Sequence, residues 1–369
     1  MTNITSITAK DNNSSPGDIR IILEGGKVSA PYNLRGDTNL RTLNWNAPAD
    51  AHGETTYELI YTSATDTQRQ IAHTSQTQIE TNLKENKYRV TIRALKNGNY
   101  SDTPPPLCIT RCATAPEYNF IKAPGQSAHI MDMVQAGDLF YVSNWTSAVW
   151  TTPKTGGVLS EQFRISGLYY ASSMLLIDDL LYVGSFAIGG ELVRMKFSTR
   201  GPEETLIQNA GSVTGLATDG TYVYASSYTG RSVIRMKIDA SGRSGIDDSY
   251  IVGIGAANGV AVDDKYIYVT EADNRSLTRV SKTKDTFDRN FITGFTKPCG
   301  VAVHKDFIYI ADAGTGKVVR ANKGGSDIDR SFLSGFDGPS KVKVDDEYIY
   351  VITDRAISRS SWGWKTETT

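Results

Sequence analysis

The sequence predicts an all-β protein made of a β-sandwich followed by a ring of six repeated sheets. Three observations lead to this prediction. Short segments between about residues 30 and 111 alternate apolar and polar side chains, a Tyr-marked strand then recurs every 41 to 44 residues, and a proline run separates the two regions. Alternation with period two indicates half-buried strands, and a fixed period of roughly 40 residues indicates a repeat architecture.

Composition excludes several classes of protein. The 369 residues include 39 Lys+Arg and 40 Asp+Glu, which leaves a formal charge of -1 and no overall field that would attract nucleic acid. The chain is 39% hydrophobic and 21% charged, as folded proteins are, and its three cysteines are too few for a disulfide framework. No stretch is apolar enough for a membrane span, and the first residues lack the pattern of a secretory signal.

The N-terminal residues 1–28 are predicted to form a polar tail. Thr, Asn, Ser and Asp dominate up to about residue 17, and such a segment has almost nothing to bury. The apolar run from Asp18 to Glu24 can add one extra strand before the glycine pair that follows it. The sequence does not identify the partner of that strand.

Residues 29–112 are predicted to form the sandwich. Trp45 and Leu43 lie on one face of a short strand, and a later strand from Tyr88 to Ala94 repeats the alternation, with Leu83 shortly before it. This segment resembles a fibronectin type III domain, in which a buried Trp packs between the sheets and a Leu and a Tyr precede and begin a long strand. The proline run at residues 104–106 then gives a stiff exit toward a boundary near Ala113.

Residues 113–369 carry an internal repeat. Each copy has an apolar strand that contains a tyrosine, and the marker tyrosines are Tyr141, Tyr182, Tyr224, Tyr268, Tyr309 and Tyr350. A second strand precedes each of them, a third strand carries a recurrent arginine, and a fourth carries an aromatic residue. The third-strand arginines are Arg194, Arg235, Arg279, Arg320 and Arg359. Four short strands in about 41 residues are typical of one blade of a β-propeller.

The repeated phrases beginning at Gly259 and Gly300 are similar to those of NHL-type and lactonase-like six-bladed propellers. That resemblance implies a six-bladed ring, and it implies little about chemistry, because such rings host both binding modules and enzymes. Six tyrosines mark six blades, but the chain stops before a last outer strand. The segment from Tyr118 to Lys122 resembles the outer strand at Phe332, so we expect it to pair with the last blade and close the ring, which leaves no open sheet edge.

The candidate ligand site lies at one rim of this ring. The position four residues after the marker tyrosine is aromatic in three successive blades, at Trp145, Phe186 and Tyr228. Aromatic faces gathered at a rim can hold a sugar or a peptide side chain, and Asp273 and Asp354 on the same rim can accept hydrogen bonds. The alternative is that the three rings only cover the contacts between blades.

The candidate channel residues lie nine positions before each marker tyrosine. This position is Asp132 in the first blade and Lys341 in the last, which are neighbours in a closed ring, so we expect an ion pair inside an open channel. The same layer is completed by Ser173, Gly215, Gly259 and Gly300. Asp132 could act as a general base, but the sequence favours the structural role.

A metal site is the alternative use of the ring. The residues three positions after the marker tyrosines include Asn144, Glu271 and Asp312, which are suitable Ca²⁺ ligands of the kind seen in lactonase-like propellers. They are not on consecutive blades, and an Asp at such a position commonly accepts hydrogen bonds from turn amides. We therefore expect no cofactor, with Ca²⁺ as the alternative.

The sequence thus favours a non-catalytic recognition or adhesion module, lectin-like in that it binds a glycan or a protein partner through the propeller face. The alternative is a metal-dependent enzyme similar to lactonases or lyases with six blades. Bacterial proteins that combine these modules are usually secreted or surface-associated, which we expect here without a visible Sec signal; a cytoplasmic location is the alternative.

Overall fold

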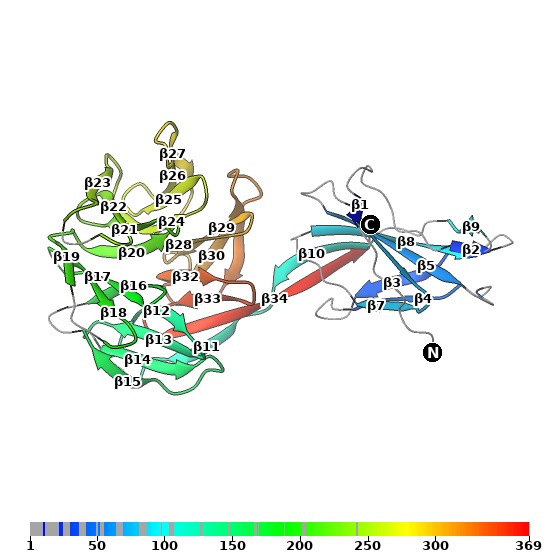
Figure 1. Cartoon of the computed structure of the whole chain (residues 1–369), viewed down its shortest axis with the longest axis horizontal. Helices are drawn as coiled ribbons and strands as arrows, with labels where there is room; N and C mark the ends of the chain where they lie inside the picture. The colour runs from blue at the N-terminus through cyan, green and yellow to red at the C-terminus, as the bar shows by residue number, and fades with distance from the viewer. Residues whose placement is uncertain are drawn as a thin grey trace. The chain divides into compact units, whose positions relative to one another are not determined.

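The structure is a computed structural model, and it describes residues 10–11, 22–24, 30–36, 42–48, 51, 55–63, 69–80, 87–96, 98–102, 107–125, 128–146, 148–165, 168, 170–187, 189–200, 204–240 and 243–368. All regular elements in these ranges are β-strands, as predicted (Figure 1). Nothing in the described ranges forms a helix with the length and apolarity needed to cross a membrane. Leu83 lies outside the described residues.

The chain divides into two compact units, which are described separately below. The first contains Met1–Thr114 together with Trp362–Thr369, and the second contains Ala115–Ser361. The sequence placed all of residues 113–369 in the propeller. The last residues join the N-terminal unit instead, because the long strand β34 (Ala356–Thr368) runs past the sixth blade and pairs with β10 (Leu107–Ala113).

The described residues of the N-terminal unit form two mainly antiparallel sheets. The smaller one has the order β3-β4-β7, formed by Tyr32–Gly36, Thr42–Asn46 and Gln78–Glu80. The central strands of the larger one have the order β6-β5-β8-β10, with β5, β6 and β8 formed by Thr56–Ser63, Arg69–Thr74 and Lys87–Lys96. Apolar residues of both sheets form one core, in which Trp45 is 2% exposed and contacts the Tyr57 ring edge-on at 5.3 Å.

The N-terminal tail contributes strands that the sequence did not predict in full. The expected extra strand is β2 (Ile22–Glu24), which pairs with β9 (Gly98–Tyr100) and lies parallel to the end of β8. In addition, β1 (Lys10–Asp11) pairs with β6 within the segment expected to be unstructured. An edge strand offers free backbone groups, so a polar segment can pair with it without burying apolar side chains.

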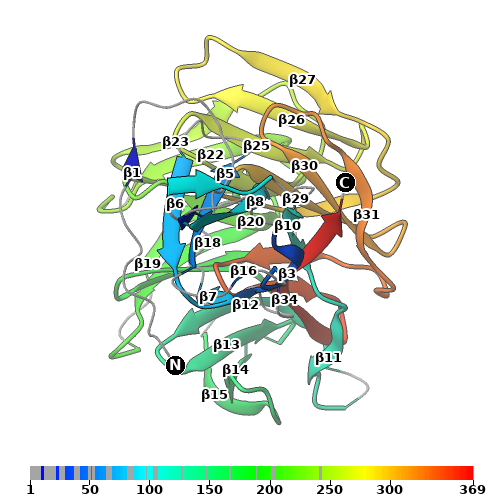
Figure 2. The same ribbon diagram turned by 90° about the vertical axis from the view of Figure 1, so that its right-hand side faces the viewer.

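The second unit is a β-propeller in which blades 1 to 5 are sheets of four antiparallel strands in sequence order (Figures 1 and 2). Blade 1 comprises β12 to β15 (Ile130–Ala136, Leu139–Asn144, Ala148–Pro153, Ser160–Arg164). Blade 2 comprises β16 to β19 (Ala171–Ile177, Leu180–Ser185, Glu191–Lys196, Glu204–Gln208). Blade 3 comprises β20 to β23 (Val213–Thr218, Tyr222–Ser227, Ser232–Lys237, Ile246–Ile251).

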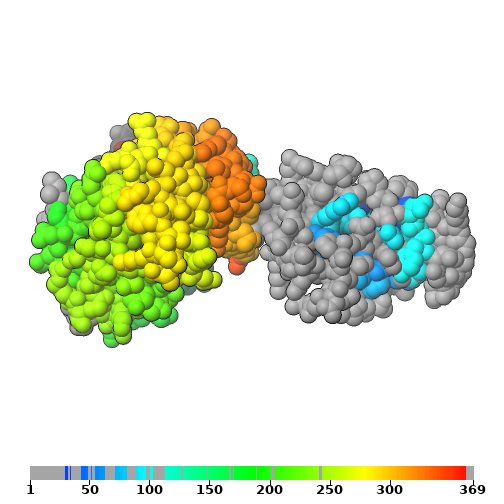
Figure 3. All heavy atoms as spheres, turned by 90° about the horizontal axis from the view of Figure 1, so that it is seen from above, coloured from blue at the N-terminus to red at the C-terminus, as the bar shows by residue number. Residues whose placement is uncertain are grey.

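The remaining blades follow the same plan. Blade 4 comprises β24 to β27 (Ala257–Val262, Tyr266–Glu271, Ser276–Ser281, Phe287–Ile292). Blade 5 comprises β28 to β31 (Pro298–His304, Phe307–Asp312, Lys317–Asn322, Asp329–Ser334). Blades 3 to 5 follow one another across the face shown in Figure 3, from yellow-green through yellow to orange. Blade 6 comprises β32 (Lys341–Val344), β33 (Tyr348–Ile352), the first part of β34 and β11 (Glu117–Lys122).

The predicted closure of the ring is confirmed. β11 pairs antiparallel with β34, with Ile121 opposite Ile357 and Lys122 opposite Ala356. A single hydrophobic cluster joins blade 1 to blade 6, and both Phe140 and Tyr350 belong to it. Burial of this cluster and pairing of the sheet edge both favour the closed ring.

The recurrent arginines stabilise the blades. Each of Arg235, Arg279, Arg320 and Arg359 lies between an aromatic ring of the second strand and one of the outer strand; for Arg279 these rings belong to Tyr266 and Phe291, at 4.5 and 3.9 Å. Arg279 also donates to the Lys323 carbonyl of the next blade at 3.0 Å. Cation–π contacts and bonds between blades thus combine in one repeated side chain.

Candidate rim site and central channel

The rim is defined here as the edge of the propeller where the second strand of each blade ends and the first begins. These ends lie together because neighbouring strands are antiparallel. Trp145, Phe186 and Tyr228 each follow directly on a second strand, while His129 and Tyr170 directly precede a first strand. The structure therefore places the three predicted aromatic residues on one rim, in adjacent blades.

Trp145 lies at the centre of a group of rings from blades 1 and 2. The His129 ring stacks on it with 4.4 Å between centroids and 15° between planes, and the Tyr170 ring meets it edge-on at 5.4 Å. The Nδ1 atom of His129 lies 2.6 Å from the Asp354 carboxylate, which connects the group to blade 6. Trp145 is 42% exposed and Tyr170 40%, so large parts of both rings face solvent.

Phe186 and Tyr228 continue the same row into blade 3. Their ring centroids are 6.2 Å apart, and Phe186 is 44% exposed. Backbone bonds connect three of these residues: Tyr170 N–H donates to the Trp145 carbonyl at 3.2 Å and Phe186 N–H to the Tyr170 carbonyl at 3.0 Å. Tyr228 N–H donates to the Ser212 carbonyl at 3.0 Å. These bonds fix the spacing of the rings, so a ligand meets a platform that is already ordered. We call these five residues, His129, Trp145, Tyr170, Phe186 and Tyr228, the aromatic row.

The two predicted carboxylates are engaged in ion pairs. Asp273 lies 2.6 Å from Arg231, and Asp354 contacts both His129 and, at 3.6 Å, Arg355. Both carboxylates remain about half exposed, so each presents a paired charge at the surface. Such pairs can still exchange hydrogen bonds with a polar ligand.

The sequence reasoning missed His129, Tyr170 and Arg231. His129 and Tyr170 occupy the position twelve residues before the marker tyrosine, and the other blades have smaller or non-aromatic residues there: Ser212, Ala256, Lys297 and Gly338. This column of the repeat could have revealed both aromatic residues. Arg231 has no such signal, because its pairing with Asp273 joins different blades and depends on the fold.

The channel differs from its prediction in one contact and in its openness. Asp132, 3% exposed, forms its ion pair with Lys343 at 2.8 Å rather than with Lys341. It also accepts the Met174 N–H of blade 2 at 2.9 Å. The Lys341 ammonium reaches the Thr214 carbonyl of blade 3, so its side chain spans the channel that the sequence expected to be open. The reason is length: a lysine two residues away along the same strand reaches Asp132 equally well.

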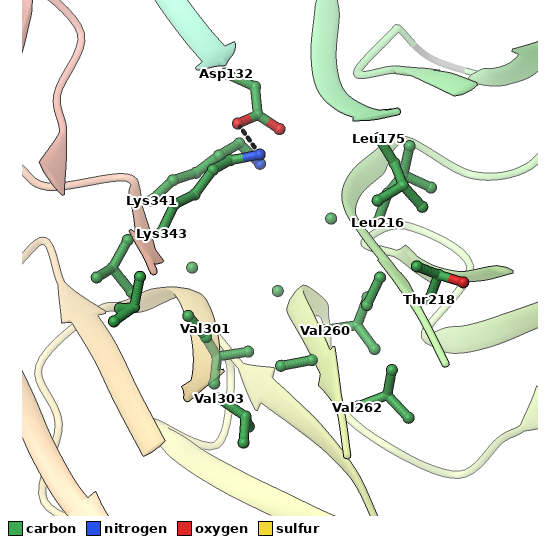
Figure 4. Close-up of a pocket in the computed structure, with 18 residues that line it drawn as sticks. Asp132, Leu175, Leu216, Thr218, Val260, Val262, Val301, Val303, Lys341 and Lys343 are labelled. Carbon is green, nitrogen blue, oxygen red and sulfur yellow. Dashed lines mark ion pairs between the residues drawn. The ribbon is translucent and has the colours of Figure 1, made fainter. Parts of the chain in front are cut away.

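The glycines of the channel layer permit close contact between neighbouring first strands. A Cβ at Gly300 would lie 2.6 Å from the Lys341 Cα, and one at Gly259 would lie 2.6 Å from the Cys299 carbonyl oxygen. Any side chain there would push adjacent blades apart. This layer and the residues that follow it on the first strands line a cavity of about 350 Å³, whose walls are mainly Val, Ala and Leu from blades 2 to 6 (Figure 4).

The candidate Ca²⁺ ligands bond to turns of their own blades. Asn144 accepts from the Thr146 and Ala148 amides, Glu271 from the Gly255 amide, and Asp312 from the Thr296 and Lys297 amides. They belong to blades 1, 4 and 5, and among the residues that the structure describes no three His, Cys, Asp or Glu side chains form a group able to hold a metal.

Burial affects two titratable groups at the channel. It lowers the pKa of Lys341, an effect that the Asp132 charge opposes and the Lys343 charge increases. Burial likewise raises the pKa of the Cys299 thiol. The layer therefore disfavours charge, and the Asp132 carboxylate stabilises the charge that is present.

Comparison with known proteins identifies the fold. No family model matches the chain, and no curated protein matches it. Among solved structures, a protein of unknown function from Bacteroides thetaiotaomicron VPI-5482 has a TM-score of 0.53 at 10% identity and covers 95% of this chain and 99% of its own. A streptogramin B lyase has a TM-score of 0.51 at 12% identity, with 76% and 91% covered.

A third similar structure is an auxiliary nutrient binding protein from Bacteroides ovatus ATCC 8483, with a TM-score of 0.50 at 11% identity and 92% and 99% covered. The shared feature is the β-propeller. At these identities the likeness concerns the fold alone, and one fold carries many functions.

Proposed function

We propose that the protein is a non-catalytic recognition module that binds a glycan through the aromatic row of its propeller. The observation that carries the proposal is the row itself: five rings from blades 1 to 3, three of them at least 40% exposed and linked by backbone bonds. Soluble proteins leave such groups of exposed rings at interaction sites, and rings that are fixed in place bind with little loss of entropy.

The surroundings of the row support a polar ligand with flat apolar faces. A sugar ring stacks its C–H face on an aromatic plane and needs hydrogen-bond partners at its edge. The Asp354–His129 pair stands at one end of the row, and the Arg231–Asp273 pair follows Tyr228 in the chain order of the blades. A protein partner that inserts a side chain between the rings is the second kind of ligand that the proposal covers.

A glycan array tests the proposal on the full chain. The parent is expected to bind a defined set of glycans, and Trp145→Ala and Tyr228→Ala are expected to weaken binding by about tenfold or more, as loss of an interface aromatic residue usually does. Phe287→Ala is the matched control, because Phe287 is 39% exposed on the outer strand of blade 4, away from the row. The absence of glycan binding, or equal binding by Trp145→Ala, would contradict glycan recognition by the row.

The rival function is a metal-dependent enzyme that holds Ca²⁺ through Asn144, Glu271 and Asp312. The solved structures that share the fold of this chain include a lyase as well as a binding protein, so the fold favours neither function. The use of all three side chains by turn amides supports the non-catalytic proposal. A site specific to the folded state would raise the melting temperature as Ca²⁺ is added; an upward shift that disappears in Asp312→Asn would favour the enzyme.

For the N-terminal unit we propose a fibronectin type III-like sandwich that spaces or presents the propeller. The strand orders β3-β4-β7 and β6-β5-β8-β10 around one core that contains Trp45 support this proposal. We also propose a secreted or surface-associated location, where glycans are accessible. Fractionation of the source cells, with detection of the chain by antibody, tests that location directly.

A further inference from the structure

We propose that the blind cavity in the propeller channel binds a small aliphatic carboxylate, with the carboxylate group at Lys341 and the alkyl chain against the apolar wall. This site is separate from the aromatic row. It uses other residues, on the first strands of the blades, and its ligand differs in chemistry from a glycan.

The shape of the cavity favours one small ligand. Its volume of about 350 Å³ lies at the lower end of the range for small-molecule sites. Neighbouring first strands are joined in its wall by Gly300 N–H to the Ser340 carbonyl at 2.8 Å and by Thr214 Oγ1 to the Ala257 carbonyl at 3.1 Å. At one end the Lys341 side chain crosses from blade 6 to the Thr214 carbonyl of blade 3 and blocks the channel.

The other end is accessible. In the first strands of blades 3 to 6 the residues nearest the turn into the second strand are half-buried, among them Thr218, Val262, Val303 and Val344. A ligand can therefore enter from the face opposite the aromatic row. The walls between this end and the closed end are aliphatic, from residues such as Leu216, Val260 and Val301 (Figure 4).

The charge of the cavity favours a monoanion. Among the described residues that line it, the charged side chains are Lys341, Lys343 and Asp132. Asp132 forms its ion pair with Lys343, and its charge also acts on Lys341, whose ammonium bonds to the Thr214 carbonyl. Two lysines therefore share one carboxylate among the described residues that line the cavity. Figure 4 shows both lysines extending toward Asp132, on one side of an otherwise apolar space. The lining thus has one positive charge in excess, which an anion stabilises in such surroundings, and an aliphatic chain fills the rest of the cavity.

Isothermal titration calorimetry with sodium octanoate tests the proposal on the full chain. Octanoate is expected to bind, 1-octanol about tenfold or more weakly because it lacks the charge, and acetate more weakly because it lacks the chain. Equal affinity for octanoate and octanol, or no binding of octanoate at millimolar concentration, would overturn the proposal.

Variants locate the site. Lys341→Met is expected to lower octanoate affinity about tenfold or more, whereas Lys317→Met is the matched control, because Lys317 is a half-buried lysine of blade 5 bonded to Ser331 and does not line the cavity. Asp132→Asn removes the opposing charge and is expected to increase affinity. Unchanged affinity in both Lys341→Met and Asp132→Asn would overturn the assignment.

A third variant does not alter the charges. Val303→Phe places a ring at the accessible end of the cavity and is expected to abolish octanoate binding while both lysines remain. Trp145→Ala is expected to leave octanoate binding unchanged, so failure of the row and failure of the cavity are distinguishable. Octanoate binding that survives Val303→Phe would place the ligand elsewhere and overturn the proposal.

Discussion

Blades 3 to 5 differ from the blades at the seam of the ring, which are 6, 1 and 2, although all six follow one plan of strands. In blades 3 to 5 the channel position is glycine at Gly215, Gly259 and Gly300. At the seam the same position is Asp132, Ser173 and Lys341. The aromatic row begins at the seam as well, with His129, Trp145 and Tyr170.

The turns between the first and second strands also differ among the blades. In blade 3, Asp219 accepts the Thr221 and Tyr222 amides, the Tyr224 hydroxyl and, at 2.9 Å, the Lys282 ammonium of blade 4. Blade 4 repeats this arrangement around Asp263, with the Tyr268 hydroxyl at 3.0 Å and Lys323 of blade 5 at 3.4 Å. In blade 2, Asp179 instead accepts from Ser198, and the Tyr182 hydroxyl bonds to the Ile238 carbonyl. Blades 3 and 4 thus repeat one set of stabilising contacts, and Asp345 of blade 6 keeps the two amide bonds, to Glu347 and Tyr348. Blade 5 has His304 at the equivalent position.

The largest expected effect concerns the glycine layer. Gly300→Val places its Cβ against the backbone of Lys341 and is expected to lower the free energy of unfolding by about 3 kcal/mol or more, since the neighbouring blade must move. Ser173→Ala at the equivalent seam position is expected to be neutral or stabilising by about 1 kcal/mol, because the buried Ser173 hydroxyl has no partner. Urea denaturation measures both. Equal losses of unfolding free energy in the two variants would show that substitutions in blades 3 to 5 and at the seam destabilise the ring to the same extent.

A smaller effect concerns acid stability. Burial alone would raise the pKa of Asp219, but the Lys282 ammonium and the Tyr222 and Thr221 amides outweigh it, with the Tyr224 hydroxyl, and lower the pKa from 3.8 to about 2. Because the folded-state pKa is the lower one, this carboxylate stabilises the fold above pH 4, and the contribution is lost as the pH falls through 4 to about 2.

Asp219→Asn tests this linkage. The variant is expected to be less stable by about 1–2 kcal/mol at pH 7, a figure reduced for solvent screening, and to match the parent near pH 2. Thermal unfolding from pH 7 to pH 2 measures the difference. Asp354→Asn on the exposed rim is the control and is expected to change stability little at any pH. If Asp219→Asn is still less stable than the parent at pH 2, the result contradicts the role of ionisation.

The smallest expected effect is on the rim. Phe186→Ala is expected to change the free energy of unfolding by about 1 kcal/mol or less, because 44% of the residue already faces solvent. Differential scanning calorimetry is the measurement. A loss comparable to that of Gly300→Val would mean that the ring packs the blades together, which is the alternative that the sequence left open, and would weaken the contrast between scaffold and seam.

The parts of the fold that repeat with a regular spacing in the sequence were predictable. The marker tyrosines such as Tyr224 fall on the second strand of every blade, and the closing segment at Tyr118 was recognisable because it resembles the outer strand at Phe332. The position of Trp145, Phe186 and Tyr228 on one rim followed from the same count. Repeats convert spacing along the chain into equivalent places in space.

Contacts between blades were not predictable in the same way. The sequence indicated that Asp132 meets a lysine, yet two lysines of one strand lie within reach, and only packing decides that Lys343 pairs with it while Lys341 crosses to Thr214. The stacking of His129 on Trp145 also joins residues that spacing did not single out.

The sequence by itself determined the strands, the number of blades and the segment that closes the ring. Each of these depends on local alternation of apolar and polar residues and on the repeat period, and both can be read directly from the sequence. The tertiary structure alone decided which charges pair, which end of the channel is closed and how the rim rings stack. These depend on side-chain reach between strands brought together only when the ring closes, and no local pattern encodes that reach.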